Sequence, residues 1–210
     1  MKHAVTRDLH AYWQRLRGRR LAPERGEIEP SDIRAILGDT FILEVAGDAT
    51  FRFRLAGTRV CALYGRELKG KDFLSFWTGR DRVTCESLMQ AVTEEAAAAV
   101  FGLELHSAHG RTLSAEAIVL PVRQSGPGFS RVLGAIATHD QPYWVGIHPI
   151  MSQDITSMRM IWPSTRPGFN EKTLHAPEDE PELVSTVAPL PTEPARRVGH
   201  LTVLEGGRSD

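Results

Sequence analysis

The spacing of apolar residues changes several times along residues 1–140, and this change restricts the possible folds more than any other feature of the sequence. Apolar residues recur every three or four positions at 9–16 and at 85–92, which is the period of an amphipathic helix. They alternate with other residues at 51–55 and 113–119, which is the period of a strand with one buried face. The chain therefore combines helices with antiparallel strands.

The predicted elements follow one another in a definite order. A leader helix is followed by a proline-punctuated connection and by two strands, 40–45 and 50–57, that form a hairpin. Short helical pieces come next, then a longer helix that begins near Thr78, and then three strands between residues 100 and 140. This order predicts an α+β fold in which five antiparallel strands form a sheet with short helices on one face.

The sequence divides into three parts. Residues 1–30 hold the leader helix and its connection, and residues 31–162 hold the sheet. At the end of this second part, residues 146–163 have the spacing of one further strand or of an interface segment. Residues 163–210 contain seven of the 13 prolines together with an acidic run, which is typical of a linker. A short β-like run follows within them, from His200 to Leu204.

Composition and charge argue against several classes of function. The net charge is −1, so no excess of positive charge attracts nucleic acid or anionic lipid. Cys61 and Cys85 each lie in an apolar helical pattern, as core thiols of a reducing compartment do. The first ten residues lack the apolar core of a signal peptide, and no apolar run reaches membrane-spanning length. We therefore expect a cytoplasmic protein with no nucleic-acid partner and no membrane insertion.

One segment, "YGRELKGKD" at residues 64–72, has the glycine and lysine spacing of a phosphate-binding P-loop. A P-loop needs a Ser or Thr directly after the lysine to place a hydroxyl on magnesium. Here that position is Asp72, whose carboxylate would repel phosphates. The residues before Gly65 have helical spacing, whereas a P-loop follows a buried strand. We therefore reject nucleotide binding at this segment.

The same segment lies within a longer match. "FRLAGTRVCALYGRELKGKDFLSFWTGRDRV" resembles the PAS pattern, in which a strand leads into a short helix, a Tyr-Gly-Arg turn, a second short aromatic helix and an Asp-Arg helix start. The element order agrees over about residues 8–140. More narrowly, "YWQRLRGRRLAPERGEIEP" followed by "FRFRLAGT" is similar to a family of small, stand-alone bacterial PAS proteins. The resemblance implies that Gly65 and Gly70 end short helices and that Lys71 is solvated.

The resemblance also implies a cavity between the inner face of the sheet and the short helices, which PAS domains use for cofactors, metabolites or nothing. Tyr64 and Trp77 are the strongest candidates for lining it, because each has a polar tip that needs a partner when it is buried. For any one candidate, filling the core is the favoured alternative, since apolar periodicity mainly reports burial. The full set of candidates is Phe53, Leu55, Tyr64, Phe73, Phe76, Trp77, Phe101, Leu103 and Val119.

The sequence disfavours flavin and haem and leaves the identity of any ligand open. A PAS-type flavin photosensor needs an Asn-Cys-Arg-Phe-Leu-Gln signature, which neither cysteine has, and residues 58–96 contain no histidine for a haem. His106 and His109 flank a turn without further ligands, so we expect no metal site. Glu104 and Glu116 lie on neighbouring strands and are expected to face solvent. No pattern supplies a nucleophile, a base and an oxyanion stabiliser, so we expect no enzyme.

Two functions fit these observations. The first is a non-enzymatic regulatory PAS module that acts by protein–protein association, as a homodimer or with an unidentified protein partner. Its leader helix has an apolar stripe that a second copy could bury, and such helices often pair across PAS dimers, as the resemblance implies. This stripe consists of Leu9, Tyr12, Trp13 and Leu16. The alternative is a sensor whose cavity binds a small apolar or aromatic ligand.

Overall fold

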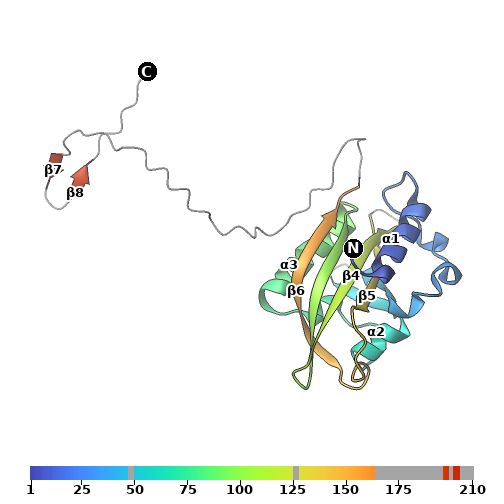
Figure 1. Cartoon of the computed structure of the whole chain (residues 1–210). Coiled ribbons are helices and arrows are strands. Elements are labelled where there is room, and N and C mark those ends of the chain that lie inside the picture. The colour runs from blue at the N-terminus through green and yellow to red at the C-terminus, as the bar shows by residue number, and fades with distance from the viewer. Residues whose placement is uncertain (47–49, 125–127, 164–195, 199–200, 204–210) are drawn as a thin grey trace. The chain divides into compact units, whose positions relative to one another are not determined.

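The computed structural model describes residues 1–46, 50–124, 128–163, 196–198 and 201–203. The chain divides into two units, residues 1–174 and residues 175–210. The first unit is built on one sheet that has helices on both faces (Figure 1).

The described residues of the second unit form two short antiparallel strands, β7 (Arg196–Val198) and β8 (Leu201–Val203). β8 lies within the β-like run that the sequence predicted at 200–204. Residues 164–195, most of the predicted linker, lie outside the described residues.

The sheet of the first unit is antiparallel throughout, with the strand order β2-β1-β5-β4-β3-β6. The predicted α+β fold is confirmed, with six strands in this sheet where five were predicted. The sixth strand, β6, is the segment for which the sequence left open a strand or an interface segment, and it pairs along β3. The strands are β1 (Thr40–Val45), β2 (Phe51–Ala56), β3 (Ala98–Ser107), β4 (Thr112–Val122), β5 (Arg131–Thr138) and β6 (Ile150–Ile161).

The helices fall into two groups along the chain, one before β1 and one between β2 and β3. The first group is α1 (Ala4–Arg17) and the 3-10 turns η1 (Arg25–Glu27), η2 (Pro30–Ile33) and η3 (Leu37–Asp39). The second group is α2 (Thr58–Leu63), η4 (Phe73–Phe76) and α3 (Gly79–Glu94), which begins after Thr78 as predicted. Each helix within the described ranges is too short or too polar to cross a lipid bilayer.

The sheet has an apolar core on each face, because neighbouring residues of its central strands are both apolar. Val119 belongs to the inner core, with residues of α2, η4 and α3. Ile118 and Leu120 on either side of it belong to the outer core, with residues of α1 and the connection. Successive residues of a strand point to opposite faces, so both faces need a cover. The short helices α2 and η4 cover one face, as predicted, and α1 covers the other (Figure 1).

The apolar stripe of α1 is buried against the sheet of its own chain. Leu9, Tyr12 and Trp13 are at most 4% exposed, and Leu16 is partly buried in the same outer core. Trp13 Nε1–H donates to the carbonyl oxygen of Pro121 at 2.8 Å, which fixes the helix on β4. The hypothesis that this stripe is a dimer or partner interface was therefore wrong, because the outer face of the sheet is itself apolar and takes the stripe.

A buried carboxylate holds the N-terminus of α1 against the sheet. Glu116 on β4 is 5% exposed and accepts hydrogen bonds from the backbone N–H of Lys2 at 2.7 Å, from that of His3 at 3.0 Å and from the Thr6 hydroxyl. The expectation that Glu116 faces solvent was wrong, because α1 covers its face of the sheet. Burial alone would raise the pKa of Glu116. The hydrogen bonds and the N-terminal charge lower it by more, so its pKa lies below the ordinary value of 4.5.

We predict that Glu116→Gln lowers the free energy of unfolding by about 2 to 3 kcal/mol, because an amide NH2 group then faces buried hydrogen-bond donors. Urea denaturation measures this loss. The matched control is Glu104→Gln, which changes a half-buried carboxylate two register positions away on the same strand pair and costs less than about 0.5 kcal/mol. Equal losses in the two variants would contradict the role assigned to Glu116.

The same interaction makes stability depend on pH. Because the pKa of Glu116 is lower in the folded chain than in the unfolded chain, its stabilisation is complete above its ordinary pKa of 4.5 and is lost as pH falls through the folded value. The difference in unfolding free energy between the wild type and Glu116→Gln therefore shrinks as the solution is acidified.

Candidate functional site

A small cavity lies between the inner face of the sheet and the short helices, where the family resemblance implied one. Its volume is about 10 Å3, which is room for a single water molecule. The residues that line it come from α2, η4, their flanking loops and all six strands of this sheet: Phe41, Phe53, Val60, Tyr64, Phe73, Trp77, Leu103, Ala117, Ile136 and Gln153.

A glycine turn after α2 places Tyr64 beside the cavity. Tyr64 is the C-cap of α2, and Gly65 then turns the chain with a φ of +62°. A Cβ atom at Gly65 would lie 2.8 Å from the Cβ of Pro149, so the position needs glycine for space as well as for conformation. The first glycine of the P-loop-like segment therefore ends a helix, as the resemblance implied.

The second glycine of that segment begins a short pairing with the edge of β2. Gly70 N–H donates to the carbonyl oxygen of Phe53 at 2.7 Å, and Phe53 N–H donates to that of Lys71 at 2.9 Å. Asp72 then accepts a hydrogen bond from Leu74 N–H at 3.3 Å and begins η4. This pairing holds η4, and the aromatic residues it carries, next to the inner face of β2.

Most of the predicted pocket residues lie together in the inner core. Five of the nine line the cavity, namely Phe53, Tyr64, Phe73, Trp77 and Leu103. Three others are buried in the same core without lining the cavity, namely Phe76, Phe101 and Val119.

Leu55 is the exception, because it is 45% exposed. Leu43 pairs with Phe53 and Ile42 pairs with Leu55, so Arg54 is one extra residue on β2. Such a bulge shifts the alternation of side chains by one position. Leu55 therefore lies on the side of Ile42, whose side chain belongs to the outer core. The prediction that Leu55 lines the pocket was wrong, because strict alternation was assumed along the whole strand.

Sequence reasoning missed Gln153, which is the one amide side chain at the cavity. It lies on β6, a strand that the sequence left open. Gln153 pairs with Leu105, a residue of the inner core. The signal that could have found it is its spacing of two from Ile155, which is packed against the same core.

Aromatic rings fill the space that a larger ligand would need. The ring centroids of Tyr64 and Phe76 lie 4.2 Å apart, and those of Phe73 and Trp77 lie 4.8 Å apart. Phe53 contacts Phe73 edge to face at 5.8 Å. Such pairs are favourable geometries for aromatic side chains. The remaining cavity is far smaller than a flavin or a haem.

Three polar side chains lie at this apolar site. The Tyr64 hydroxyl donates to Gln153 Oε1 at 2.6 Å, and both residues are buried. Burial raises the pKa of Tyr64, so the phenol stays protonated and remains a donor. Trp77 is 2% exposed, and its Nε1–H has no hydrogen-bond partner among the described residues.

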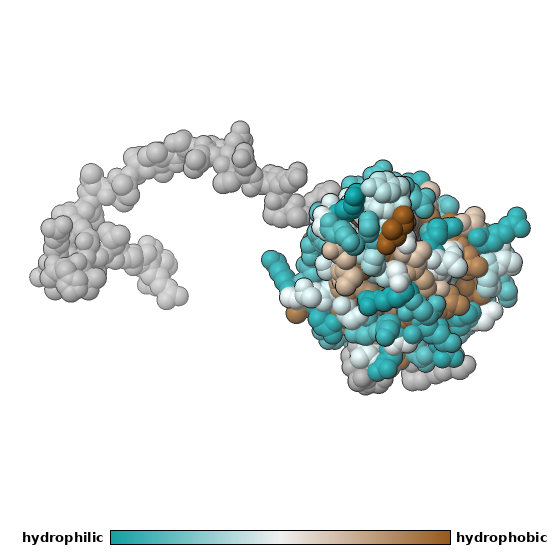
Figure 2. Space-filling view, turned by 90° about the horizontal axis from the view of Figure 1, so that it is seen from below, coloured by the Kyte–Doolittle hydropathy of each residue, from teal (hydrophilic) through white to brown (hydrophobic). Residues whose placement is uncertain are grey.

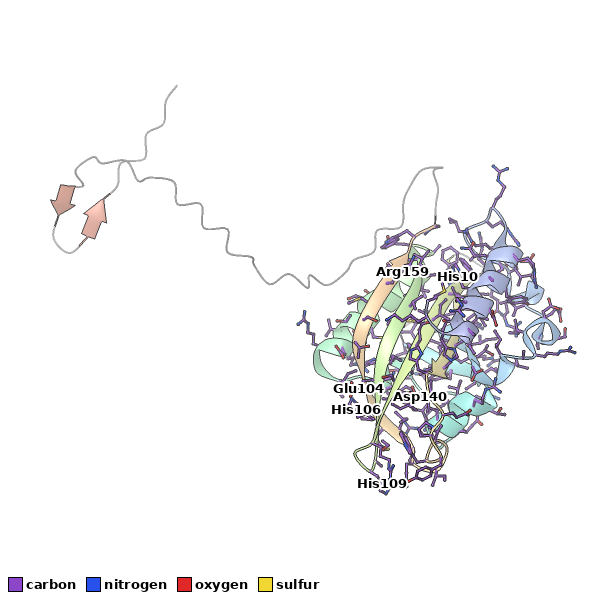
Figure 3. The ribbon with its side chains drawn as sticks, in the orientation of Figure 1. His10, Glu104, His106, His109, Asp140 and Arg159 are labelled. Carbon is purple, nitrogen blue, oxygen red and sulfur yellow. The ribbon has the colours of Figure 1, made fainter. Side chains whose placement is uncertain are left out.

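The other polar residues that enzymes use do not converge in the described part of the chain. His106 pairs with Asp154 at 2.8 Å, whereas the ring of His109 contacts that of His148, so the two histidines labelled His106 and His109 in Figure 3 have different partners. In that part, no group of three or more His, Cys, Asp or Glu side chains could hold a metal ion. Burial raises the pKa of the Cys85 thiol, which disfavours the reactive thiolate.

Comparison with known proteins agrees with this architecture. A family model described as "PAS domain" matches residues 1–137, more than half of the 210 residues. The architecture described above, an antiparallel sheet with short helices over a central cavity, agrees with this family match. Both assign the protein to the class of sensory and regulatory domains. The chain belongs to the PAS domain family. No curated protein matches it.

Solved structures resemble the chain at low identity. A light-oxygen-voltage domain, from a study of a flavin analogue, is 15% identical with a TM-score of 0.42, and the match covers 54% of this chain and 85% of that one. The PAS domain of an HTR-like protein from Haloarcula marismortui is 17% identical with a TM-score of 0.38, and the match covers 51% of this chain and 89% of that one. At these values the likeness carries no argument about the ligand or function of this chain.

We predict that Tyr64→Phe lowers the free energy of unfolding by about 1 to 3 kcal/mol, because it leaves the buried Gln153 amide without its donor. The matched control is the double variant Tyr64→Phe with Gln153→Leu, which removes both partners and regains most of the loss. Thermal or urea denaturation of four proteins, namely the wild type, the two single variants and the double variant, measures the coupling. Additive losses in the double variant would contradict a direct interaction between the two side chains.

Proposed function

We propose that this PAS domain is a non-enzymatic, cytoplasmic regulatory module that acts by protein–protein association, with a second copy of the chain as its first partner. The observation that carries the proposal is the closure of the aromatic cluster around a cavity of about 10 Å3. A drug-sized or cofactor-sized ligand needs a pocket of at least about 300 Å3. Association through the surface is therefore favoured over binding in the core.

The edge strand β6 is the surface we assign to this association. Met151, Met158 and Trp162 are 60%, 44% and 52% exposed along or just beyond β6. Tryptophan and methionine are enriched in protein interfaces, and tryptophan is frequent among the residues that dominate binding energy. At the end of the domain seen in Figure 2, hydrophobic side chains reach the surface in separate patches among hydrophilic ones.

The sequence of β6 favours a second copy as the occupant. Asp154 and Arg159 lie equally far on either side of the bond between residues 156 and 157, and so do Met151 and Trp162. A two-fold axis at this point brings opposite charges together and apolar residues together, as a self-complementary interface requires. Ile155 N–H already donates to Asp81 at 2.8 Å, so side chains rather than continuous backbone pairing would make the contact.

A ligand sensor remains the second candidate, because one specific observation favours it. Trp77 lines an apolar cavity, and its buried Nε1–H has no acceptor among the described residues. A few placed polar groups in an apolar pocket are what small-molecule sites offer. A small apolar or aromatic ligand would have to displace aromatic side chains in order to enter.

We predict that the double variant Met158→Ser with Trp162→Ser weakens self-association about tenfold or more, because each substitution removes exposed apolar contact area. Sedimentation equilibrium over a range of concentrations measures the dimer constant. The matched control is Leu55→Ser, which changes an equally exposed leucine on β2 at the opposite edge of the sheet. A wild type that stays monomeric, or a control that weakens the dimer equally, would refute the assignment.

A further inference from the structure

Two buried indoles of the domain, those of Trp13 and Trp77, differ in one respect. Trp13 is 3% exposed and its Nε1–H donates to the carbonyl oxygen of Pro121 at 2.8 Å. Trp77 is 2% exposed and its Nε1–H has no partner within the described part of the chain. An indole N–H can only donate, and a buried donor without an acceptor destabilises the folded chain. The environment of Trp77 therefore calls for an acceptor that the side chains around it do not provide.

The size and chemistry of the adjacent cavity define this acceptor. About 10 Å3 is room for one water molecule and for little else. A buried water needs two to four polar partners. Three residues that line the cavity carry such groups, which are the Trp77 N–H, the Tyr64 hydroxyl oxygen and Gln153 Oε1.

We propose that the cavity is a binding site for one ordered water molecule, which accepts a hydrogen bond from Trp77 and donates to the Tyr64–Gln153 pair. Every donor and acceptor in this arrangement has a partner. Tyr64 donates to Gln153 Oε1 at 2.6 Å, and the oxygens of both side chains keep a free lone pair that can accept from the water. The water satisfies the indole donor and places its own two hydrogens on these lone pairs.

This water connects three parts of the fold. Trp77 is the C-cap of η4, Tyr64 is the C-cap of α2, and Gln153 lies on β6. The water thus joins the helices over the inner face to the strand that carries the proposed association surface. Only this last connection rests on the proposed function, since the water site itself depends on the cavity alone.

Nuclear Overhauser and rotating-frame cross-peaks between water and the two indole Hε1 protons test the proposal in the full-length protein. Trp77→Phe assigns the Trp77 resonance. The expected result is a cross-peak from Trp77 Hε1 to a long-lived water and none from Trp13 Hε1, whose acceptor is a carbonyl. Tyr64→Phe removes the nearest exchanging hydroxyl, and the cross-peak persists in this variant because Trp77 and Gln153 still hold the water.

Several results would overturn the proposal. One is a resolved Trp77 Hε1 resonance without a water cross-peak, which would mean a dry cavity. Another is loss of the cross-peak in Tyr64→Phe, which would mean that the signal came from the hydroxyl. Extra mass in a native mass spectrum that leaves on denaturation would also overturn it, because an organic ligand would then occupy the core. A monomeric wild type refutes the association proposal and leaves the water result unchanged.

Discussion

The structure depends on a sheet that is apolar on both faces. Along β4, Ile118 and Leu120 face one way and Val119 faces the other, so neither face of the central strands can remain in water. The inner face is closed by α2, η4 and α3, and the outer face by α1 and the connection after it. Glu116 secures the outer cover, because its buried carboxylate takes the free donors at the start of α1.

This double cover decides where function can lie. The stripe of α1 is used within the chain, and the aromatic residues of the inner face pack against one another, which leaves a cavity of about 10 Å3. The surfaces that remain include the edge strand β6, where large apolar side chains are exposed, and the core keeps a few polar groups at the cavity. Gln153 belongs to β6 and binds Tyr64, so the strand at the surface is also the strand that reaches the core.

Much of the candidate site could be predicted from the sequence, and the failures have identifiable causes. The alternation of apolar residues along the predicted strands identified Phe53 and Leu103, which line the cavity. Tyr64 and Trp77 were expected at the cavity because of their polar tips, and they also line it. The prediction for Leu55 was wrong because a bulge at Arg54 turns Leu55 to the opposite face of the sheet. The alternation of apolar residues in the sequence does not show this bulge. Gln153 was missed because the sequence left open whether its segment is a strand, so its spacing of two from Ile155 was not interpreted as a shared buried face.

The sequence by itself determined the α+β class, the order of helices and strands, and the helix-ending role of Gly65, because these depend on local spacing and local backbone preference. Only the tertiary structure decided which surface covers the stripe of α1, which carboxylate is buried, and how much space the aromatic side chains leave. The stripe on α1 has the same pattern whether it packs on a sheet or on a second copy. The choice between them depends on the outer face of strands more than 100 residues away in the chain, as the bond from Trp13 to Pro121 shows.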